Sequence, residues 1–128
     1  ISTLARLASG DDTLVSGFVI SAQWPQRVLV RAIGPTLAEF GVVDAAANPQ
    51  LTVFQGSQAI ATNEGWGATE EAVTALTDAF DRSGAFRLDS ASRDAAVVLM
   101  MQPGAYTVQV RNGDARGGSV LLEVYDIP

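Results

Sequence analysis

The side chains that most often carry out covalent and acid–base chemistry are missing from this sequence. Its 128 residues include no histidine and no cysteine, and all eight basic residues are arginine. A histidine base, a thiolate nucleophile, a Schiff-base lysine and a tetrahedral zinc site are therefore excluded. What remains is a site built from carboxylates, arginine, hydroxyls and amides, or no reactive site at all.

Paired carboxylates are the one remaining route to catalysis. Glu70 and Glu71, or Asp78 and Asp81, could in principle act as a general acid and base. The two glutamates follow Thr69, however, which is a good N-cap, and a helix favours negative charge in its first turn. The two aspartates fall on the solvated face of the same expected helix. We therefore expect a protein that is not an enzyme.

Oxygen-rich loops raise the question of calcium. Asp11 and Asp12 lie in a turn that contains glycine, and Asn63 and Glu64 begin an irregular segment. Calcium needs six to eight oxygen ligands, and the sequence contains no EF-hand or nonapeptide motif. Because Asp and Asn also close turns, these residues fit a calcium site or plain turn chemistry. Apart from calcium, we expect no cofactor.

Two tryptophans are candidates for a sugar-binding platform. Trp66 stands between two glycines in an expected loop, and Trp24 precedes a proline in another loop. Exposed aromatic rings can stack on sugars, but the same residues can also pack in the core with their polar tip bonded. Of the two, Trp66 is the better candidate for an exposed ring.

Arg31 interrupts an otherwise apolar strand-like segment, residues 27–33. A buried arginine must be paired, because an isolated charge in the protein interior is very unfavourable. We predict a structural ion pair with a carboxylate such as Asp94 or Glu64.

The elements that would position these residues are mostly strands. Short apolar or alternating segments recur between turns every 8–12 residues, a pattern typical of β-sandwiches. One stretch, 70–81, instead has apolar residues at helical spacing. The sequence thus predicts an all-β fold, an antiparallel β-sandwich or jelly roll in one domain over 1–128, with one short helix and about nine strands. The expected strands are 1–8, 13–21, 27–33, 51–54, 59–62, 85–88, 95–101, 106–111 and 119–125.

The first expected strand is the most interesting for assembly. Its side chains alternate, with Ile1, Thr3, Ala5 and Leu7 on one side, as in an edge strand. An exposed edge can pair with another chain, and an extended segment can complete a neighbour's sheet. Pairing inside its own domain is the alternative. Head-to-tail contacts between identical copies that do not close into a ring generate a filament.

Several segments together resemble a known kind of module. They include SGFVIS (16–21), VLVRAIGPTLAEFGV (28–42), NEGWG (63–67), PGAYTVQV (103–110) and LLEVYD (121–126). They resemble a β-rich repeat module of secreted multidomain proteins of Verrucomicrobia and related bacteria, and 28–42 is the most specific part. The second half also resembles the pre-peptidase C-terminal domains of secreted bacterial enzymes. The resemblance implies a non-catalytic sandwich and supplies no active-site residues.

Charge and hydropathy limit the classes of partner that this protein is expected to bind. The net charge of −6 argues against nucleic acid, and no apolar run approaches the roughly 20 residues of a membrane-spanning helix. The sequence starts at Ile1 rather than Met, as expected after signal-peptide removal or for one unit of a longer chain. We expect a secreted or cell-surface structural module whose partner is itself, as a homo-oligomer or filament, or neighbouring repeats. The alternative is a glycan- or calcium-binding accessory module of a secreted enzyme.

Overall fold

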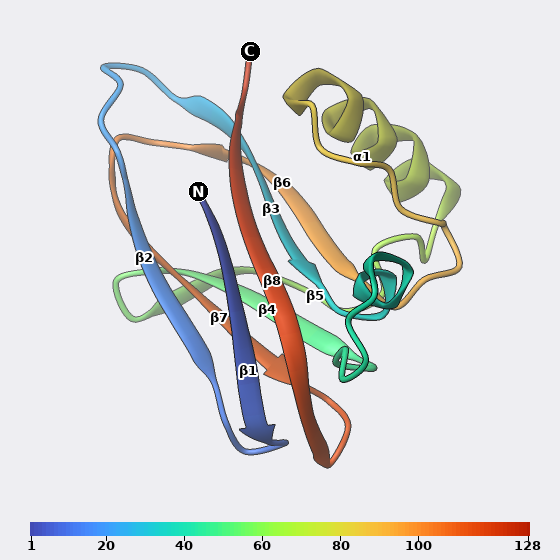
Figure 1. Cartoon of the computed structure of the whole chain (residues 1–128). Helices are drawn as coiled ribbons and strands as arrows, with labels where there is room; N and C mark the ends of the chain where they lie inside the picture. Colours follow the sequence, from blue (N-terminus) through green and yellow to red (C-terminus); the bar gives the residue numbers. More distant parts are fainter.

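The computed structural model describes all residues, 1–128, and contains eight strands, one α-helix and one 3-10 helix (Figure 1). In chain order these are β1 (Ser2–Ser9), β2 (Leu14–Ile20), β3 (Gln26–Ile33), η1 (Pro35–Phe40), β4 (Pro49–Gln55), β5 (Gln58–Asn63), α1 (Glu70–Ser83), β6 (Ala95–Met101), β7 (Gly104–Asn112) and β8 (Arg116–Ile127).

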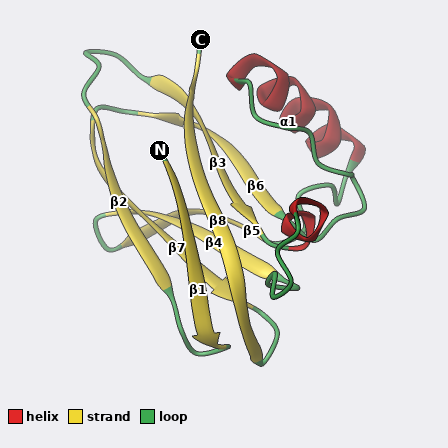
Figure 2. Ribbon diagram, viewed as in Figure 1, coloured by secondary structure: helices red, strands yellow, loops and turns green.

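The strands form two four-stranded sheets in which every neighbouring pair is antiparallel. Sheet A has the order β1-β8-β3-β6, and sheet B has the order β2-β7-β4-β5. The sheets face each other, while the helices lie to one side (Figure 2). The predicted antiparallel β-sandwich with one short helix is confirmed.

One expected strand is absent. Residues 85–88 form no ladder, and Ala85 and Leu88 are instead buried in the cluster beneath α1. Their apolar side chains were the reason to expect a strand, but they serve the contact between helix and sheet. The helix itself begins as predicted after Thr69, whose hydroxyl accepts a hydrogen bond from the amide of Ala72 at 3.1 Å. It continues two residues beyond the predicted end.

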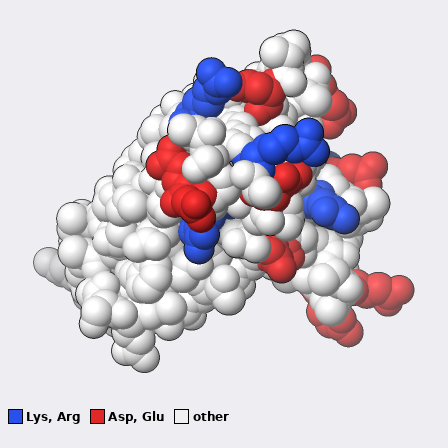
Figure 3. Space-filling model, turned by 90° about the horizontal axis from the view of Figure 1, so that it is seen from below, with Lys and Arg blue, Asp and Glu red and all other residues white.

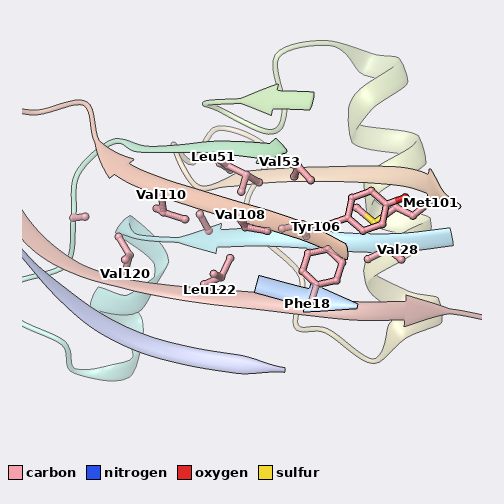
Figure 4. Packing of buried hydrophobic residues seen from close by; sticks show 14 of the residues in the cluster. Phe18, Val28, Leu51, Val53, Met101, Tyr106, Val108, Val110, Val120 and Leu122 are labelled. Atoms are coloured by element: carbon pink, nitrogen blue, oxygen red, sulfur yellow. The ribbon is translucent and has the colours of Figure 1, made fainter. Parts of the chain in front are cut away.

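The inner core fills the space between the two sheets. Alternation along each strand sends every second side chain inward, and the resulting cluster includes Val28, Val53 and Val108, all fully buried. Phe18 stacks on Tyr106 with ring centroids 5.7 Å apart at the end of this core (Figure 4). Cross-strand packing of this kind fixes the register, because a one-residue slip would turn the apolar side chains outward.

A second core covers the outer face of sheet A. Helix α1 contributes Leu76 and Phe80, the sheet contributes Leu29 and Ile33, and Trp66 closes the cluster. The molecule therefore has three layers, sheet B, sheet A and the helical layer. The outer face of sheet B has no such cover (Figure 1). No helix of the structure has the length and apolar character needed to span a membrane.

Candidate functional site

The only buried ion pair joins neighbouring strands on the helix side of sheet A. Arg31 and Glu123 face each other in the β3–β8 register, with Nη2 2.7 Å and Nε 2.9 Å from Oε1 of the glutamate. The third donor, Nη1, bonds to the carbonyl oxygen of Phe86 at 2.6 Å. The guanidinium also lies over the rings of Phe80 and Phe86, 4.9 and 4.4 Å from their centroids. The predicted buried pair is confirmed.

The predicted partner of Arg31, by contrast, is wrong. Asp94 is fully buried, but its carboxylate accepts hydrogen bonds from the Gly34 amide at 2.7 Å, from the Ser92 hydroxyl at 2.8 Å and from the amide and hydroxyl of Thr36. These donors satisfy the carboxylate without a cation, and they fix the start of η1. Glu123 was overlooked, although it is a charged residue inside an apolar strand, as Arg31 is.

Tyr125 extends this cluster toward the surface. Its hydroxyl donates to Oε2 of Glu123 at 2.5 Å. Burial, reinforced by this hydrogen bond to a carboxylate, raises the pKa of Tyr125 to about 12. No buried side-chain nitrogen or oxygen lacks a hydrogen-bond partner. The cluster holds sheet A and the helical layer together.

The tryptophans do not form a platform. Trp66 is only 1 % exposed, its ring lies 5.1 Å from that of Phe80, and its indole nitrogen donates to the carbonyl oxygen of Asp89 at 3.0 Å. The prediction of an exposed Trp66 is therefore wrong, since the glycine-flanked loop passes under α1. Trp24 is exposed, as expected for its loop, but it has no aromatic partner there.

The proposed calcium ligands serve turns and strand ends. Both carboxylate oxygens of Asp12 accept backbone amides, from Ala8 and Thr13. Asn63 accepts the Ala96 amide, and Glu64 accepts the Gln50 side-chain amide at 2.7 Å. Asp11 lines a separate polar hollow beside Gln50. No group of three or more His, Cys, Asp or Glu residues is placed to hold a metal ion. The hydrogen bonds of Asp12 and Asn63 to backbone amides are those of turns and strand ends.

The carboxylates of α1 are surface groups. Asp78 pairs with Arg82, and Asp81 pairs with Arg87, at 2.9 and 2.7 Å. The hydrogen bond from Arg87 holds the pKa of Asp81 below its ordinary value. Each of these two carboxylates is thus held by an exposed guanidinium.

The free edges of sheet A are the remaining candidates. At one edge, β1 pairs only with β8, and Ile1 exchanges both backbone hydrogen bonds with Val124, at 3.0 and 2.9 Å. Because backbone groups alternate along a strand, those of Ser2, Leu4 and Arg6 point away from β8. The amide of Ala8 is already capped by Asp12. We call these three outward-facing residues the β1 edge.

The opposite edge of sheet A is β6. The Ala96 amide bonds to Asn63 rather than to β3, so the backbone groups of Val98 and Met100 also point away from the sheet. We call Val98 and Met100 the β6 edge. Leu4 and Met100 are 61 % and 62 % exposed, which is unusual for such large apolar side chains. No sequence signal other than the alternation of residues 1–8 indicated which strands would be the edges.

Comparisons with known proteins identify the fold alone. No family model matches this sequence, and no curated protein matches it. Among solved structures, the pre-peptidase C-terminal domain of collagenase from Bacillus anthracis is similar, with a TM-score of 0.58 and 13 % identity over 97 % of this chain and 87 % of that domain. The Yersinia pseudotuberculosis-derived mitogen has a TM-score of 0.53 and 6 % identity, over 100 % of this chain and 85 % of that one.

A third similar structure is CorA, a surface-associated copper-binding protein of Methylomicrobium album BG8. It has a TM-score of 0.50 and 12 % identity, over 99 % of this chain and 93 % of that one. The resemblance to pre-peptidase C-terminal domains is thus confirmed at the level of a β-rich fold. The Verrucomicrobia origin and the repeat character stay predictions.

Proposed function

We propose that this protein is a non-enzymatic structural module of the bacterial cell surface or extracellular space, and that copies join head to tail through the two edges of sheet A. The observation that carries the proposal is that both edges, β1 and β6, present unpaired backbone groups and an exposed apolar side chain. Resemblance of segments such as 28–42 to modules of secreted proteins supports the extracellular part.

Strand direction makes such a junction geometrically regular. Sheet A has four strands that alternate in direction, so β6 runs antiparallel to β1. A second copy shifted along the sheet therefore places its β1 antiparallel to β6 of the first. Sheet B also has four alternating strands, so β5 and the β2 of the next copy match in the same way. Both sheets can continue from copy to copy.

The edges also lack the usual protection against pairing. Natural edge strands commonly carry charges, proline or bulges that prevent association. β6, with the sequence AAVVLMM, has no charged residue or proline, and β1 has a single charge, at Arg6. That guanidinium is drawn toward Asp44, 3.1 Å away. In the extended sheet, Leu4 and Met100 would lie on the same face and pack together.

The start of the chain favours edge pairing over strand exchange. The turn after β1 is tied by the two bonds of Asp12 and by the Gly10 amide, which bonds to the carbonyl oxygen of Ala115 at 3.1 Å. Leu7 is buried in the inner core. Exchange of β1 between copies would break these contacts, whereas pairing at its free edge keeps them. In the structure, β1 pairs with β8 of its own domain, which is the alternative that the sequence left open.

A cysteine-free chain allows a direct test of the junction. Introduced cysteines are the only thiols, so Leu4→Cys combined with Met100→Cys should give a ladder of disulfide-linked multimers under mild oxidation. A mixture of the two single variants should stop at dimers. The matched control combines Leu4→Cys with Val43→Cys and leaves Met100 unchanged. Val43 is at a fully exposed loop position, and this variant should give no ladder.

Two outcomes would count against the proposal. If Leu4→Cys alone forms the main dimer, the contact is a symmetric β1–β1 pair and the head-to-tail arrangement is wrong. If the double variant stays monomeric in sedimentation at high concentration, the edges do not associate. The backbone contribution can be checked with Leu4→Pro, which removes an amide facing solvent and should abolish association without breaking the β1–β8 ladder.

A further inference from the structure

The outer face of sheet B is almost free of charge in a strongly charged protein. The chain has eight arginines and 14 acidic residues, yet the four strands of sheet B contain only Arg111, near the end of β7. Seen from below, charged side chains gather on one part of the molecule, while the side on which β2 lies carries none (Figure 3). A solvent-exposed sheet has no folding reason to exclude charge.

Hydroxyl and amide groups take the place of charges. One row of outward side chains crosses all four strands through paired residues, Val15, Gln109, Thr52 and Thr62. The Oγ1 atoms of Thr52 and Thr62 lie 3.5 Å apart. Beside them is a hollow of about 490 Å³ lined only by polar residues, which are Gln50, Thr52, Thr62, Asn63 and Glu64.

The next row contains a glycine that the fold does not require. Gly17 pairs with Thr107, and Thr107 pairs with Phe54, a half-buried aromatic residue. The register of β2 is continuous at Gly17, so there is no bulge there. A Cβ at this position would meet only the carbonyl oxygen of Tyr106, at an ordinary 3.7 Å. Glycine weakens a strand, and one that packing does not demand often marks the close approach of a ligand.

The geometry points to a neutral polysaccharide as the occupant of this face, which we call the sheet B face and define by the two rows above together with Gln50. A partner must supply hydrogen bonds, because burying hydroxyls and amides without partners is unfavourable. It must also be uncharged to match the face. Of the residue types that are enriched in the cores of protein interfaces, the rows contain only one aromatic residue, Phe54, and no Met or Arg.

The same two rows define how a sugar chain would contact the sheet B face. Gly17 leaves the outer face of β2 open beside Thr107, and Phe54 lies on the other side of Thr107 in the same row. The apolar face of a sugar ring can lie on Phe54, while Gln109 and the threonines bond to its hydroxyls. The proposed assembly also joins β5 to the β2 of the next copy, so residues of both rows, such as Gly17 and Thr62, lie on strands that the junction would use. Their outward side chains take no part in that backbone pairing, so polysaccharide binding by the unassociated protein tests this inference separately from the assembly.

The test is retention on defined polysaccharides. The full chain should be retarded in affinity gels containing neutral β-glucan or xylan, or be pulled down by cellulose or chitin. Retention should persist in high salt, since the two rows contain no charged residue. Gly17→Val should fold with unchanged or higher stability and weaken binding about tenfold or more, because the added methyls occupy the contact space. Thr74→Val, on the exposed face of α1, is the matched control.

Three results would overturn the inference. One is the absence of binding to every neutral polymer in this set. Another is retention only on acidic polygalacturonate. The third is equal binding by Gly17→Val and the unmodified chain. If Gly17→Val instead abolishes self-association, the face is a protein contact and the glycan assignment is wrong.

Discussion

Removal of Glu123 should be among the most damaging single changes in this protein. Arg31 has no solvent exposure, and the side chain of Glu123 is 6 % exposed. In Glu123→Ala the guanidinium loses two of its three hydrogen bonds and keeps only the one to the carbonyl oxygen of Phe86. Breaking a buried pair in this way costs about 3–5 kcal/mol. For a domain of this size that lowers the Tm by roughly 10–20 °C.

Urea unfolding followed by tryptophan fluorescence measures this cost. Trp66 is buried 5.1 Å from Phe80, whose ring lies under the Arg31 guanidinium, so it reports on the same cluster. The exposed Trp24 should first be replaced by phenylalanine, which leaves a single emitter. Asp78→Ala is the matched control, because the surface pair that it breaks contributes only about 0.2–1 kcal/mol.

A double replacement separates the charge from the packing. Arg31→Met combined with Glu123→Leu removes both ions and keeps most of the volume, so it should recover most of the lost stability. The reasoning is refuted if Glu123→Ala costs no more than Asp78→Ala. It is also refuted if the double variant is as unstable as the single one, since the deficit would then come from lost contacts rather than from an unpaired charge.

Three further changes have defined outcomes. Because the folded-state pKa of Tyr125 is raised to about 12 from 10.0, its contribution is fully present below pH 10 and is lost as the pH rises toward 12; urea unfolding should show this loss, and Tyr125→Phe should remove it. Asp94→Ala leaves the hydrogen-bond donors of Gly34 and Thr36 without an acceptor and should lower the free energy of unfolding by about 2–4 kcal/mol in the same assay. Gly117→Ala places a Cβ 2.0 Å from the carbonyl oxygen of Leu7, so amide exchange in β1 should accelerate relative to β3, as measured by mass spectrometry.

Local signals in the sequence were sufficient for the sandwich and its helix. Alternating side chains in strands such as residues 106–111 predicted which residues face the inner core, and the cap at Thr69 located the start of α1. These features depend on neighbours within a few positions. The prediction of a strand at residues 85–88 was wrong, because a short apolar run does not reveal whether it will pair in a sheet or pack under a helix.

Long-range partners were beyond the sequence. The choice of Glu123 over Asp94 for Arg31 depends on the β3–β8 register, between residues 92 positions apart. Trp66 looked exposed because glycines flank it, but the path of its loop under α1 is set by the packing of Phe80 and Leu76. The sequence shows that the segments forming sheet B contain few charged residues. It does not show that these segments lie in one sheet, which depends on the pairing of β2, β7, β4 and β5.

The two proposals together predict the shape of an assembly. Neighbouring strands in a sheet rotate by about 20–25°, so four strands added per copy give a rotation of roughly 80–100° between successive copies. Successive sheet B faces would then point in different directions around the axis. Such a filament would bind several polysaccharide chains at once rather than lie flat on one surface. Electron microscopy of the assembled protein should show this helical rotation, and an untwisted or closed array would exclude continuation of the sheets through β1 and β6.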